Sequence, residues 1–380
     1  MNKNLIVKIS NGFGNQMFLY ASAYAFSKKL GYNLLIDDET GIRHDLKKRS
    51  KKRKLHWKPK YELGIFNLKS NIVEDKYKLG NLKRKYLKFI DRFYSKKNFL
   101  IEKKDKNKIT SYSDEYFFQK YNATIYFEGY FESENYFKEY RNDLLKEFSF
   151  KSNPNLKNNI FKNMIDNSNV VSIAFRRRRF TEIEGEDRDK VKVQKTVDFE
   201  NATVKYIYQG IEYFRSKVKN PKFLIWSDSF DNLDNFFDPQ IFTFVKNDVE
   251  DKIFLDFFLL CQCKYFIVGP TSFHWWSAWL SNHEKKIIVC PKNPELNVSS
   301  NINFWPESWI KLKVRNPMLK DIHTVPWGAS IVGLAGLLVF FALALVIAFG
   351  SPTLAINAYL QLIHFGALML AFIGAIHWGL

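Results

Sequence analysis

The chain begins with a short apolar segment, a glycine loop and a helical pattern. Leu5 to Ile9 is an apolar run typical of a buried strand, and the loop Asn11-Gly-Phe-Gly-Asn-Gln separates it from a helical stretch that ends at Leu30. A second strand-like run, Tyr32 to Ile36, ends at Asp37. Strand, helix and strand in this order predict a βαβ unit that opens an α/β domain.

A second alternation of strands and helices follows Asn153-Pro154, which resembles an interdomain joint. The apolar runs predict strands at Val170 to Phe175, Phe223 to Trp226, Ile241 to Val245, Tyr265 to Val268 and Lys286 to Cys290. Helical patterns lie between them, near Val204 to Ser216, Asp231 to Phe237, Asp251 to Leu260 and Phe273 to Leu280. We therefore expect two Rossmann-like domains, 1–150 and 151–315, that face each other across a cleft and bind ligands at the carboxyl ends of parallel strands.

Between the first βαβ unit and the joint, the pattern is less regular. It stops from Arg43 to Lys60, and Lys47 to Lys54 holds seven basic residues in eight positions. Such a run usually forms a solvated loop, with attraction to a membrane surface or to nucleic acid as alternatives. No nucleic-acid-binding motif accompanies the run, so we expect no nucleic acid partner. Residues 61–150 are rich in Lys and aromatic residues and close with a polar helix that ends near Phe148.

Composition excludes a disordered protein and narrows the partners. The 380 residues are 46% hydrophobic and 17% aromatic, enough to fill substantial cores. An excess of 58 Lys and Arg over 39 Asp and Glu gives a net charge of +19. This sign favours diphosphate or polyanionic ligands, anionic membranes or nucleic acid, without choosing among them.

The cysteines and the start of the chain indicate a reducing compartment. Cys261, Cys263 and Cys290 lie in apolar surroundings without a CxxC pair or a His at ligand spacing, so we expect reduced core residues. Met1 leads directly into the first strand without the apolar stretch of a secretory signal. We expect the N-terminal part to be cytoplasmic.

The strongest candidate chemistry is an arginine run at the end of a strand. The strand Val170 to Phe175 delivers Arg176, Arg177, Arg178 and Arg179 to its carboxyl end, where a basic surface run is the alternative interpretation. Guanidinium groups bind phosphate oxygens bidentately and stay charged, so they can neutralise a diphosphate leaving group. No Asp-x-Asp follows a cleft-facing strand, and we therefore expect no metal and no other cofactor.

Several motifs, in order and spacing, resemble one known family. They are Asn11-Gly-Phe-Gly-Asn-Gln-Met-Phe-Leu-Tyr-Ala, Phe127-Glu-Gly-Tyr-Phe-Glu-Ser-Glu-Asn-Tyr-Phe, Ile225-Trp-Ser-Asp and Ser272-Phe-His-Trp-Trp-Ser-Ala-Trp-Leu. Together they are similar to the signatures of glycosyltransferase family 11, the α1,2-fucosyltransferases, over residues 5 to about 310. The resemblance implies a GT-B architecture, GDP-fucose as donor, the 2-hydroxyl of a galactoside in a glycan as acceptor, inversion at the anomeric carbon and no required metal.

The resemblance also implies site residues. In the family a His-x-Arg-Arg-x-Asp motif lies at the donor diphosphate, and Arg176 and Arg177 match its arginine pair, so we expect these two to be the catalytic clamp. Glycines allow close backbone approach, and the following helix presents N–H groups to an anion. For donor binding we select Gly12, Gly14, Asn15, Gln16, Asp228, Ser272 and Phe273.

The chain departs from the family pattern at the arginine run. Ala174 stands at the position of the motif's His and Arg179 at that of its Asp, which fits a divergent subgroup or reduced activity. A catalytically impaired protein that binds a nucleotide sugar or a glycan is therefore the alternative function. The general base stays open among Glu128, Asp228 and Glu182. For Trp275, Trp276, Trp279 and His274, core packing is favoured over sugar stacking or catalysis.

The tail has a different composition. After the basic residues up to Lys320, Trp327 to Phe349 and Ile356 to His377 are uncharged apolar stretches joined at Gly350-Ser-Pro-Thr. Their length predicts two transmembrane helices within 321–380, and the basic flank predicts a membrane protein with its catalytic domains on the cytoplasmic side. A buried globular hairpin is the alternative. The tail resembles the start of a small multi-helix membrane protein family, and both a natural anchor and a fused reading frame stay open.

Overall fold

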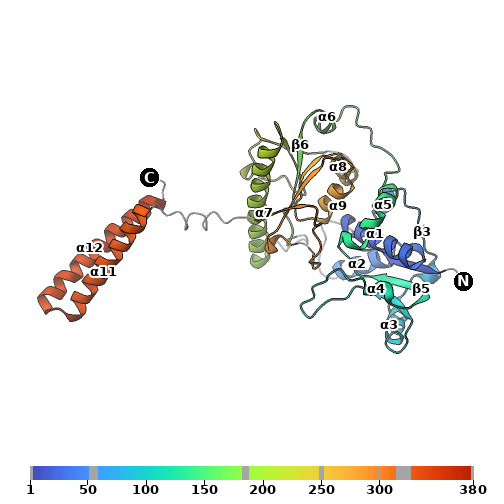
Figure 1. The fold of residues 1–380 in the computed structure, drawn as a ribbon, viewed down its shortest axis with the longest axis horizontal. Helices are drawn as coiled ribbons and strands as arrows, with labels where there is room; N and C mark the ends of the chain where they lie inside the picture. The colour runs from blue at the N-terminus through green and yellow to red at the C-terminus, as the bar shows by residue number, and fades with distance from the viewer. Residues whose placement is uncertain are drawn as a thin grey trace. The chain divides into compact units, whose positions relative to one another are not determined.

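The computed structural model describes residues 3–50, 59–181, 188–247, 252–297, 299–313 and 327–377. The chain divides into two compact units, Met1–Val314 and Arg315–Leu380. Figure 1 shows two sheets with their covering helices in the first unit and a pair of helices in the second.

The first sheet is parallel throughout. Its strands are β1 (Asn4–Lys8), β2 (Asn33–Asp37), β3 (Asn71–Ile72), β4 (Lys97–Ile101) and β5 (Tyr121–Glu128), in the order β3-β2-β1-β5-β4. On the central strand β1, Leu5 lies opposite Leu34 of β2 and Ile125 of β5, and all three side chains are buried. The predicted βαβ opening is confirmed.

Within the residues that the structure describes, helices and short 3-10 turns accompany this sheet. The helices are α1 (Phe13–Leu30), α2 (Thr40–Ser50), α3 (Asn81–Ile90), α4 (Glu115–Phe118) and α5 (Arg141–Glu147), and the 3-10 turns are η1 (Leu63–Ile65), η2 (Asp75–Tyr77), η3 (Glu134–Tyr136) and η4 (Lys138–Tyr140). The expectation of a loop from Arg43 onward is wrong up to Ser50, because α2 occupies this segment. The rest of the basic run, residues 51–54, lies outside the described residues.

The second sheet is also parallel. It contains β6 (Val170–Phe175), β7 (Lys222–Ser227), β8 (Phe242–Phe244), β9 (Tyr265–Ile267), β10 (Ile287–Pro291) and β11 (Ile310–Leu312), in the order β11-β10-β9-β6-β7-β8. Every residue of β6 is buried, as expected for a central strand with helices on both faces. The α/β fold with two Rossmann-like halves is thus confirmed, with β11 as a strand that the sequence pattern did not predict.

The helices of the second half are α6 (Ile160–Asn167), α7 (Lys190–Lys217), α8 (Lys252–Cys261) and α9 (Ser272–Leu280), with 3-10 turns η6 (Leu233–Asn235) and η7 (Pro294–Leu296). In place of the helix expected from Asp231 to Phe237, the structure has only the turn η6. Asn232, the residue before this turn, has a left-handed φ of 49°, so no helix can run through it from Asp231. Helix α7 starts earlier than predicted, at an N-cap where Asp189 accepts hydrogen bonds from the N–H groups of Val191 and Lys192.

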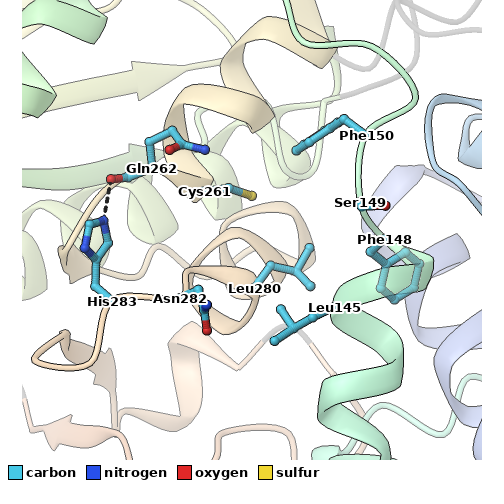
Figure 2. A pocket seen from close by; sticks show the side chains of 9 residues that line it. All are labelled: Leu145, Phe148, Ser149, Phe150, Cys261, Gln262, Leu280, Asn282 and His283. Carbon is cyan, nitrogen blue, oxygen red and sulfur yellow. Dashed lines mark hydrogen bonds between the residues drawn. The ribbon is translucent and has the colours of Figure 1, made fainter.

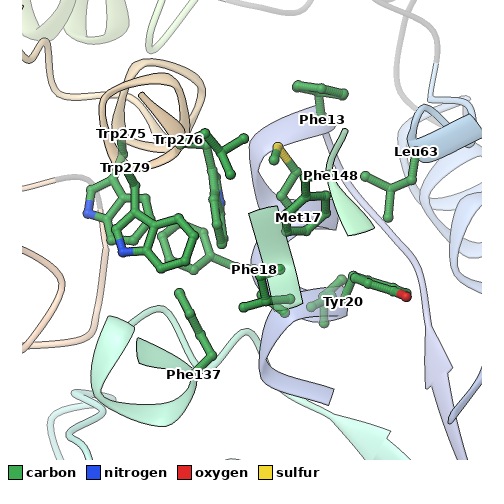
Figure 3. Close-up of a cluster of buried hydrophobic side chains, with 14 of the residues drawn as sticks. Phe13, Met17, Phe18, Tyr20, Leu63, Phe137, Phe148, Trp275, Trp276 and Trp279 are labelled. Carbon is green, nitrogen blue, oxygen red and sulfur yellow. The ribbon is translucent and has the colours of Figure 1, made fainter. Parts of the chain in front are cut away.

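The two halves share one aromatic core, formed where α1 packs against α9 (Figure 3). The ring of Phe18 lies 4.6 Å from that of Trp275 and 4.9 Å from that of Trp276, and Phe137 stacks on Trp276 at 5.3 Å. Trp275 and Trp276 are fully buried, and Trp279 nearly so. Core packing of the tryptophans is therefore confirmed, and it holds the two sheets in one compact unit.

The second unit is a hairpin of α11 (Trp327–Phe349) and α12 (Pro352–His377), in which the rings of Phe340 and Phe365 lie 5.8 Å apart. The side chains of residues 327–337 and 368–377 lie outside the described residues. In the part of the chain that the structure describes, no helix has the length and the apolar character that a membrane crossing requires. The predicted transmembrane pair is thus a helical hairpin whose membrane span is not supported.

Candidate active site

The sequence-selected residues gather at the carboxyl ends of the parallel strands. The glycine loop follows β1, the arginine run follows β6, Asp228 follows β7, and Ser272 opens α9 after β9. Ser272 Oγ donates a hydrogen bond to Asn15 Oδ1 at 2.9 Å, so the loops of the two halves are in direct contact. This is the edge at which α/β proteins bind their ligands.

Gly14 allows this contact. A Cβ atom added at Gly14 would lie 2.6 Å from the carbonyl carbon and from Oγ of Ser272 and 2.8 Å from the N atom of Phe273. No larger residue fits there without moving the backbone of α9. The first turn of α1 can approach the first turn of α9 only because residue 14 has no side chain.

The two helix N-termini that meet here carry no carboxylate of their own. Gly12 is the N-cap of α1 and makes no side-chain cap, and the first turns of α1 and α9 contain no acidic residue. Thr271 caps α9, and its Oγ1 accepts a hydrogen bond from the N–H of His274. Helix N-termini favour anions, and this arrangement brings two of them to one region of the site.

Gln16 supports the glycine loop from inside. Its side chain is fully buried, its Nε2 donates to the carbonyls of Asn11 and Lys60 at 2.8 Å, and its Oε1 accepts from the N–H of Glu62 at 2.9 Å. These bonds occupy the polar atoms of the amide within the protein. Gln16 thus shapes the loop, and its predicted contact with the donor remains a prediction that this burial does not favour.

Phe273 belongs to an aromatic contact between the halves. Its ring lies 5.8 Å from that of Phe13 in α1 and 5.1 Å from that of Phe257 in α8. The ring is partly buried against this core. Its side chain therefore helps to hold α9 beside α1, behind the helix ends that line the site.

Arg176 and Arg179, which follow β6, act on each other as like charges. Both guanidinium groups are half-buried, and burial lowers the pKa of Arg176. Burial and the charge of Arg176 lower the pKa of Arg179 to about 10, against the opposing attraction of Glu132. Two guanidiniums that repel each other in a partly dehydrated place provide a site for an anion with several oxygens.

Arg177 points elsewhere. Its Nε forms an ion pair with Glu200 Oε1 at 3.3 Å, its guanidinium donates to the carbonyl of Asp231, and it lies 5.5 Å from the centre of the Phe236 ring. The clamp expected from Arg176 and Arg177 remains a prediction. Arg179 acts on Arg176 as a like charge, and its guanidinium lies 5.1 Å from the centre of the Phe199 ring.

Asp228 holds the backbone of the arginine run. Its Oδ1 accepts from the N–H of Arg177 at 2.8 Å, and its Oδ2 faces the N–H of Arg178 at 3.4 Å. Arg178 is exposed and pairs with Asp231 at 3.3 Å. The carboxylate of Asp228 therefore shapes the loop that presents Arg176 and Arg179, while its contact with a nucleotide stays a prediction.

The three carboxylates considered as general bases are not equivalent in the structure. Glu128 is engaged by Arg84, at 2.5 and 2.7 Å, and by Lys88, at 2.6 Å. Burial acts to raise the pKa of Glu128, but these hydrogen bonds outweigh it and leave that pKa lowered. Asp228 is engaged as described above, and Glu182 lies outside the described residues. The lowered pKa of Glu128 makes it a poor proton acceptor near neutral pH.

The structure indicates a further candidate base, Glu132, which the sequence motifs did not single out. It follows β5 by four residues, is half-buried, and its Oε2 accepts a hydrogen bond from Ser299 Oγ at 2.5 Å. Burial raises its pKa to about 7, against the lowering effects of Ser299, Lys104 and Arg179. Its place just beyond a strand end in the Phe127 motif was the available signal, but the pattern gave no means to rank it above Glu128.

His274 and the cysteines are structural. His274 is fully buried, its Nδ1 accepts from the N–H of Gly269 at 3.1 Å, and its Nε2 lies 3.3 Å from Ser172 Oγ. Burial lowers the pKa of His274 to about 3, so the ring is neutral. Cys261, Cys263 and Cys290 are free thiols whose pKa values burial raises, as expected for reduced core residues.

A separate pocket of about 310 Å³ opens beside α5 and the C-terminal ends of α8 and α9 (Figure 2). In it, His283 Nε2 lies 2.9 Å from the carbonyl oxygen of Gln262. Helices in this fold run against the strands, so the pocket lies at the amino edge of the second sheet, opposite the arginine run. It has no guanidinium or carboxylate in its lining, and we do not assign the chemistry to it.

Within the described ranges, no cluster of three or more His, Cys, Asp or Glu side chains is arranged to hold a metal ion.

Comparison with known proteins agrees with these features. Residues 2–313 match the sequence model described as Glycosyl transferase family 11. An alpha-1,2-colitosyltransferase of Escherichia coli is 25% identical over 323 residues, which cover 81% of this chain and 99% of that protein. The O-antigen biosynthesis glycosyltransferase WbnK of Escherichia coli is 27% identical over 327 residues, 80% of this chain and 99% of that protein.

Solved structures with similar folds include fucosyltransferases. The crystal structure of fucosyltransferase NodZ from Bradyrhizobium superposes with a TM-score of 0.40 and 11% identity over 73% of this chain and 92% of that one. A mutant of Arabidopsis thaliana FUT1 in complex with GDP gives a TM-score of 0.41 and 10% identity over 74% of this chain and 69% of that one. These superpositions are partial, and the match to the family does not depend on them.

Proposed function

Since the chain belongs to glycosyltransferase family 11, we propose that it is an inverting fucosyltransferase that transfers fucose from GDP-fucose to the 2-hydroxyl of a galactoside in a glycan. Relatives similar over almost their whole length are named as a colitosyltransferase and as an O-antigen biosynthesis glycosyltransferase. The class of reaction thus has support from the family. The donor, the acceptor and the linkage are the proposal.

The observation that carries the proposal is the half-buried pair Arg176 and Arg179. When the glycosidic bond breaks, negative charge builds up on the departing diphosphate. Two guanidiniums and two helix N-termini at one strand edge stabilise that charge without a metal ion. A bound diphosphate also relieves the repulsion between the two arginines, which favours binding of this ligand over a neutral one.

In this scheme the second half holds the donor and the first half presents the acceptor. The arginine run and the N-terminus of α9 belong to the second half, and the glycine loop meets them from the first. Gly12, Gly14 and Asn15 then border the donor near the contact between the halves. Asp228 keeps the arginine run in place and is a further candidate for a nucleotide contact.

A colitosyl group in place of fucose is the second candidate, favoured by the name of the relative at 25% identity. The alternative from the sequence, an impaired nucleotide-sugar or glycan binder, rests on Ala174 and Arg179 at positions where the family has His and Asp. Burial and the like charge of Arg176 lower the pKa of Arg179, and a bound anion would relieve both effects. A role of Arg179 in anion binding weakens the case for an impaired protein.

Calorimetric titration with GDP-fucose, other GDP sugars and UDP sugars tests the donor, and an assay of fucose transfer to β-galactosides tests the reaction. Arg176→Ala and Arg179→Ala should each weaken donor binding by roughly 1.5 to 3 kcal/mol, about 10-fold to 150-fold in Kd. Arg178→Ala is the matched control, because that side chain is exposed and pairs with Asp231. Unchanged affinity in both variants, or no transfer by the folded protein, would refute the proposal.

Two sequence expectations remain predictions with simple tests. Activity should persist in excess EDTA if no metal is required. A membrane location, with the catalytic domains on the cytoplasmic side, predicts that the full chain sediments with membranes while residues 1–314 do not. Equal sedimentation of both forms would remove this expectation.

A further inference from the structure

The proposed function requires a base that takes the proton of the acceptor hydroxyl, and no residue has yet been assigned to this role. In an inverting transfer the nucleophile and the diphosphate lie on opposite faces of the sugar. The base must therefore come from the side of the site that faces the arginines. In this chain that side is the first half, at the carboxyl end of its sheet.

Carboxylates near that edge and near the arginine run are mostly engaged in structural roles. Glu128 is held by Arg84 and Lys88, and Glu200 by Arg177. Asp228 binds the backbone of the arginine run. These contacts occupy the carboxylates within the protein, and in Glu128 they also leave the pKa lowered, which makes it a poor proton acceptor.

Glu102 is also an unsuitable base. Its side chain is buried, and its Oε2 accepts the N–H of Tyr130 at 2.9 Å. A Cβ atom on Gly129 would lie 2.2 Å from the Cβ of Glu102, so the turn after β5 covers this residue closely. A group enclosed in this way does not reach an acceptor hydroxyl.

Glu132 differs from these residues in its contacts and its position. It stands on the first half, four residues beyond the end of β5, and Arg179 acts on it as an opposite charge. Among the hydrogen bonds of the described residues, it accepts one, at Oε2 from Ser299. That bond holds the carboxylate from the second half and engages Oε2, while no hydrogen bond to Oε1 is found among the described residues.

Burial raises the pKa of Glu132 to about 7. The hydrogen bond from Ser299 and the positive charges of Lys104 and Arg179 act in the opposite direction, and the negative charge of Glu102 adds to the effect of burial. A base of that strength is well matched to proton transfer near neutral pH, because it is substantially deprotonated yet binds the proton in the transition state.

We propose that Glu132 is the general base of the transfer, an inference that rests on the proposed function. The acceptor hydroxyl oxygen forms a bond to the anomeric carbon of the donor sugar, and its proton passes to Glu132 Oε1. The bond from the anomeric carbon to the diphosphate oxygen breaks, and its electron pair stays on the diphosphate, where Arg176 and Arg179 neutralise it. Ser299 orients the carboxylate through its hydrogen bond to Oε2.

The variant Glu132→Gln tests the assignment, because the amide keeps the size of the side chain and an oxygen that accepts from Ser299. We expect kcat for transfer to fall roughly 10²-fold to 10⁴-fold. The Kd for the donor should stay within about threefold. In the wild type, log kcat should rise with pH up to about 7 and then level off, and this acid limb should be absent from the variant.

Glu134→Gln is the matched control. Glu134 lies in the same motif, burial also raises its pKa, and its Oε2 accepts from Trp279 Nε1 at 3.1 Å, a bond within the core between the halves. This variant should keep kcat and the acid limb of the pH profile. A structural loss shared by both variants would instead lower the melting temperature and weaken donor binding in each.

The outcomes separate the two proposals. If the wild type transfers fucose and Glu132→Gln keeps both its kcat and its acid limb, the base assignment is overturned and the fucosyltransferase proposal stands. If the folded wild type binds no GDP sugar and transfers none, the proposed function is refuted, and so is the assignment of the base. Lost turnover with retained donor affinity in Glu132→Gln alone supports both.

Discussion

Ser272 and Asn15 stand 257 residues apart in the chain and share a hydrogen bond of 2.9 Å. The bond joins the first turn of α9 to the first turn of α1, and Gly14 provides the space for it. Two motifs that belong to different sheets thus form one wall of the site. The geometry of the proposed donor site depends on how closely these helix ends approach.

Replacing Gly14 with Ala should separate them. The new methyl group would meet Ser272 at 2.6 Å, a distance that real structures relieve by moving backbone. We expect a loss of about 1 to 3 kcal/mol in the free energy of unfolding, and a lower affinity for GDP. Denaturant titration and calorimetry measure the two effects.

Gly64→Ala controls for the loss of a glycine in the same unit. Its nearest neighbour to an added Cβ atom is the Tyr61 ring at 3.8 Å, an ordinary contact. This variant should change the free energy of unfolding by less than about 0.5 kcal/mol. Equal effects of the two substitutions would contradict the close-approach argument.

Arg177 should contribute more to stability than to donor binding. Arg177→Ala leaves the carboxylate of Glu200 without its ion-pair partner, and the two side chains are only 16% and 12% exposed. We expect a coupling energy of about 1 to 2 kcal/mol in a double-mutant cycle with Glu200→Ala, measured by denaturant unfolding. The effect of Arg177→Ala on the Kd for GDP should be smaller than that of Arg176→Ala.

The exposed pair Arg215 and Glu212, at 3.7 Å, is the comparison for that cycle. Its side chains are half or more exposed, so its coupling energy should stay below about 0.5 kcal/mol. A donor affinity that falls more with Arg177→Ala than with Arg176→Ala would restore the arginine pair expected from the family motif.

His274 makes the folded protein sensitive to acid. Burial lowers the pKa of His274 to about 3 in the folded state, while the unfolded chain takes up a proton near 6.5. The folded state therefore loses stability as pH falls below about 6.5, by up to roughly 1.4 kcal/mol per pH unit from this group. The free energy of unfolding of His274→Gln lacks this pH dependence. If the variant is less stable than the wild type at pH 7.5, the difference in free energy of unfolding should become smaller between pH 6.5 and 4.5, which paired urea titrations measure.

Glu132→Gln should stabilise the protein at neutral pH. The folded-state pKa of about 7 lies above the unfolded value, so the wild type binds the Glu132 proton more tightly when folded. Its stability is therefore lost as pH rises from about 4.5 through 7. The amide does not ionise. The free energy of unfolding of the variant relative to the wild type should therefore increase over this range, by up to about 3 kcal/mol. A constant difference from pH 5 to 8 in paired urea titrations would contradict the assigned environment.

Local pattern was enough for most of the fold. The bounds of β6 agree with the apolar run from Val170 to Phe175, because a central strand is buried on both faces and reads as unbroken hydrophobicity. The pattern was less informative where a single backbone conformation decides the outcome. Asn232, with its left-handed φ, reduces an expected helix to one turn, and no periodicity shows this.

The candidate site was predicted in its location and changed in its details. Every motif that the sequence selected is found at the carboxyl edges or at the contact between the halves, because strand ends and helix starts are local properties. The direction of each side chain is not local. Arg177 pairs with Glu200, and Arg179 is under the influence of Arg176 and of Glu132, which is distant along the chain.

The sequence by itself determined the two parallel α/β halves, the glycine loop, the arginine run and the family to which they point. Only the tertiary structure decided which residues pair with the arginines of the run and with the carboxylates, and that Glu132 accepts a hydrogen bond from Ser299 and is under the influence of Arg179. The physical reason is that secondary structure follows from the period of neighbouring residues. The pKa and orientation of a side chain depend on burial and on charges that folding brings from other parts of the chain.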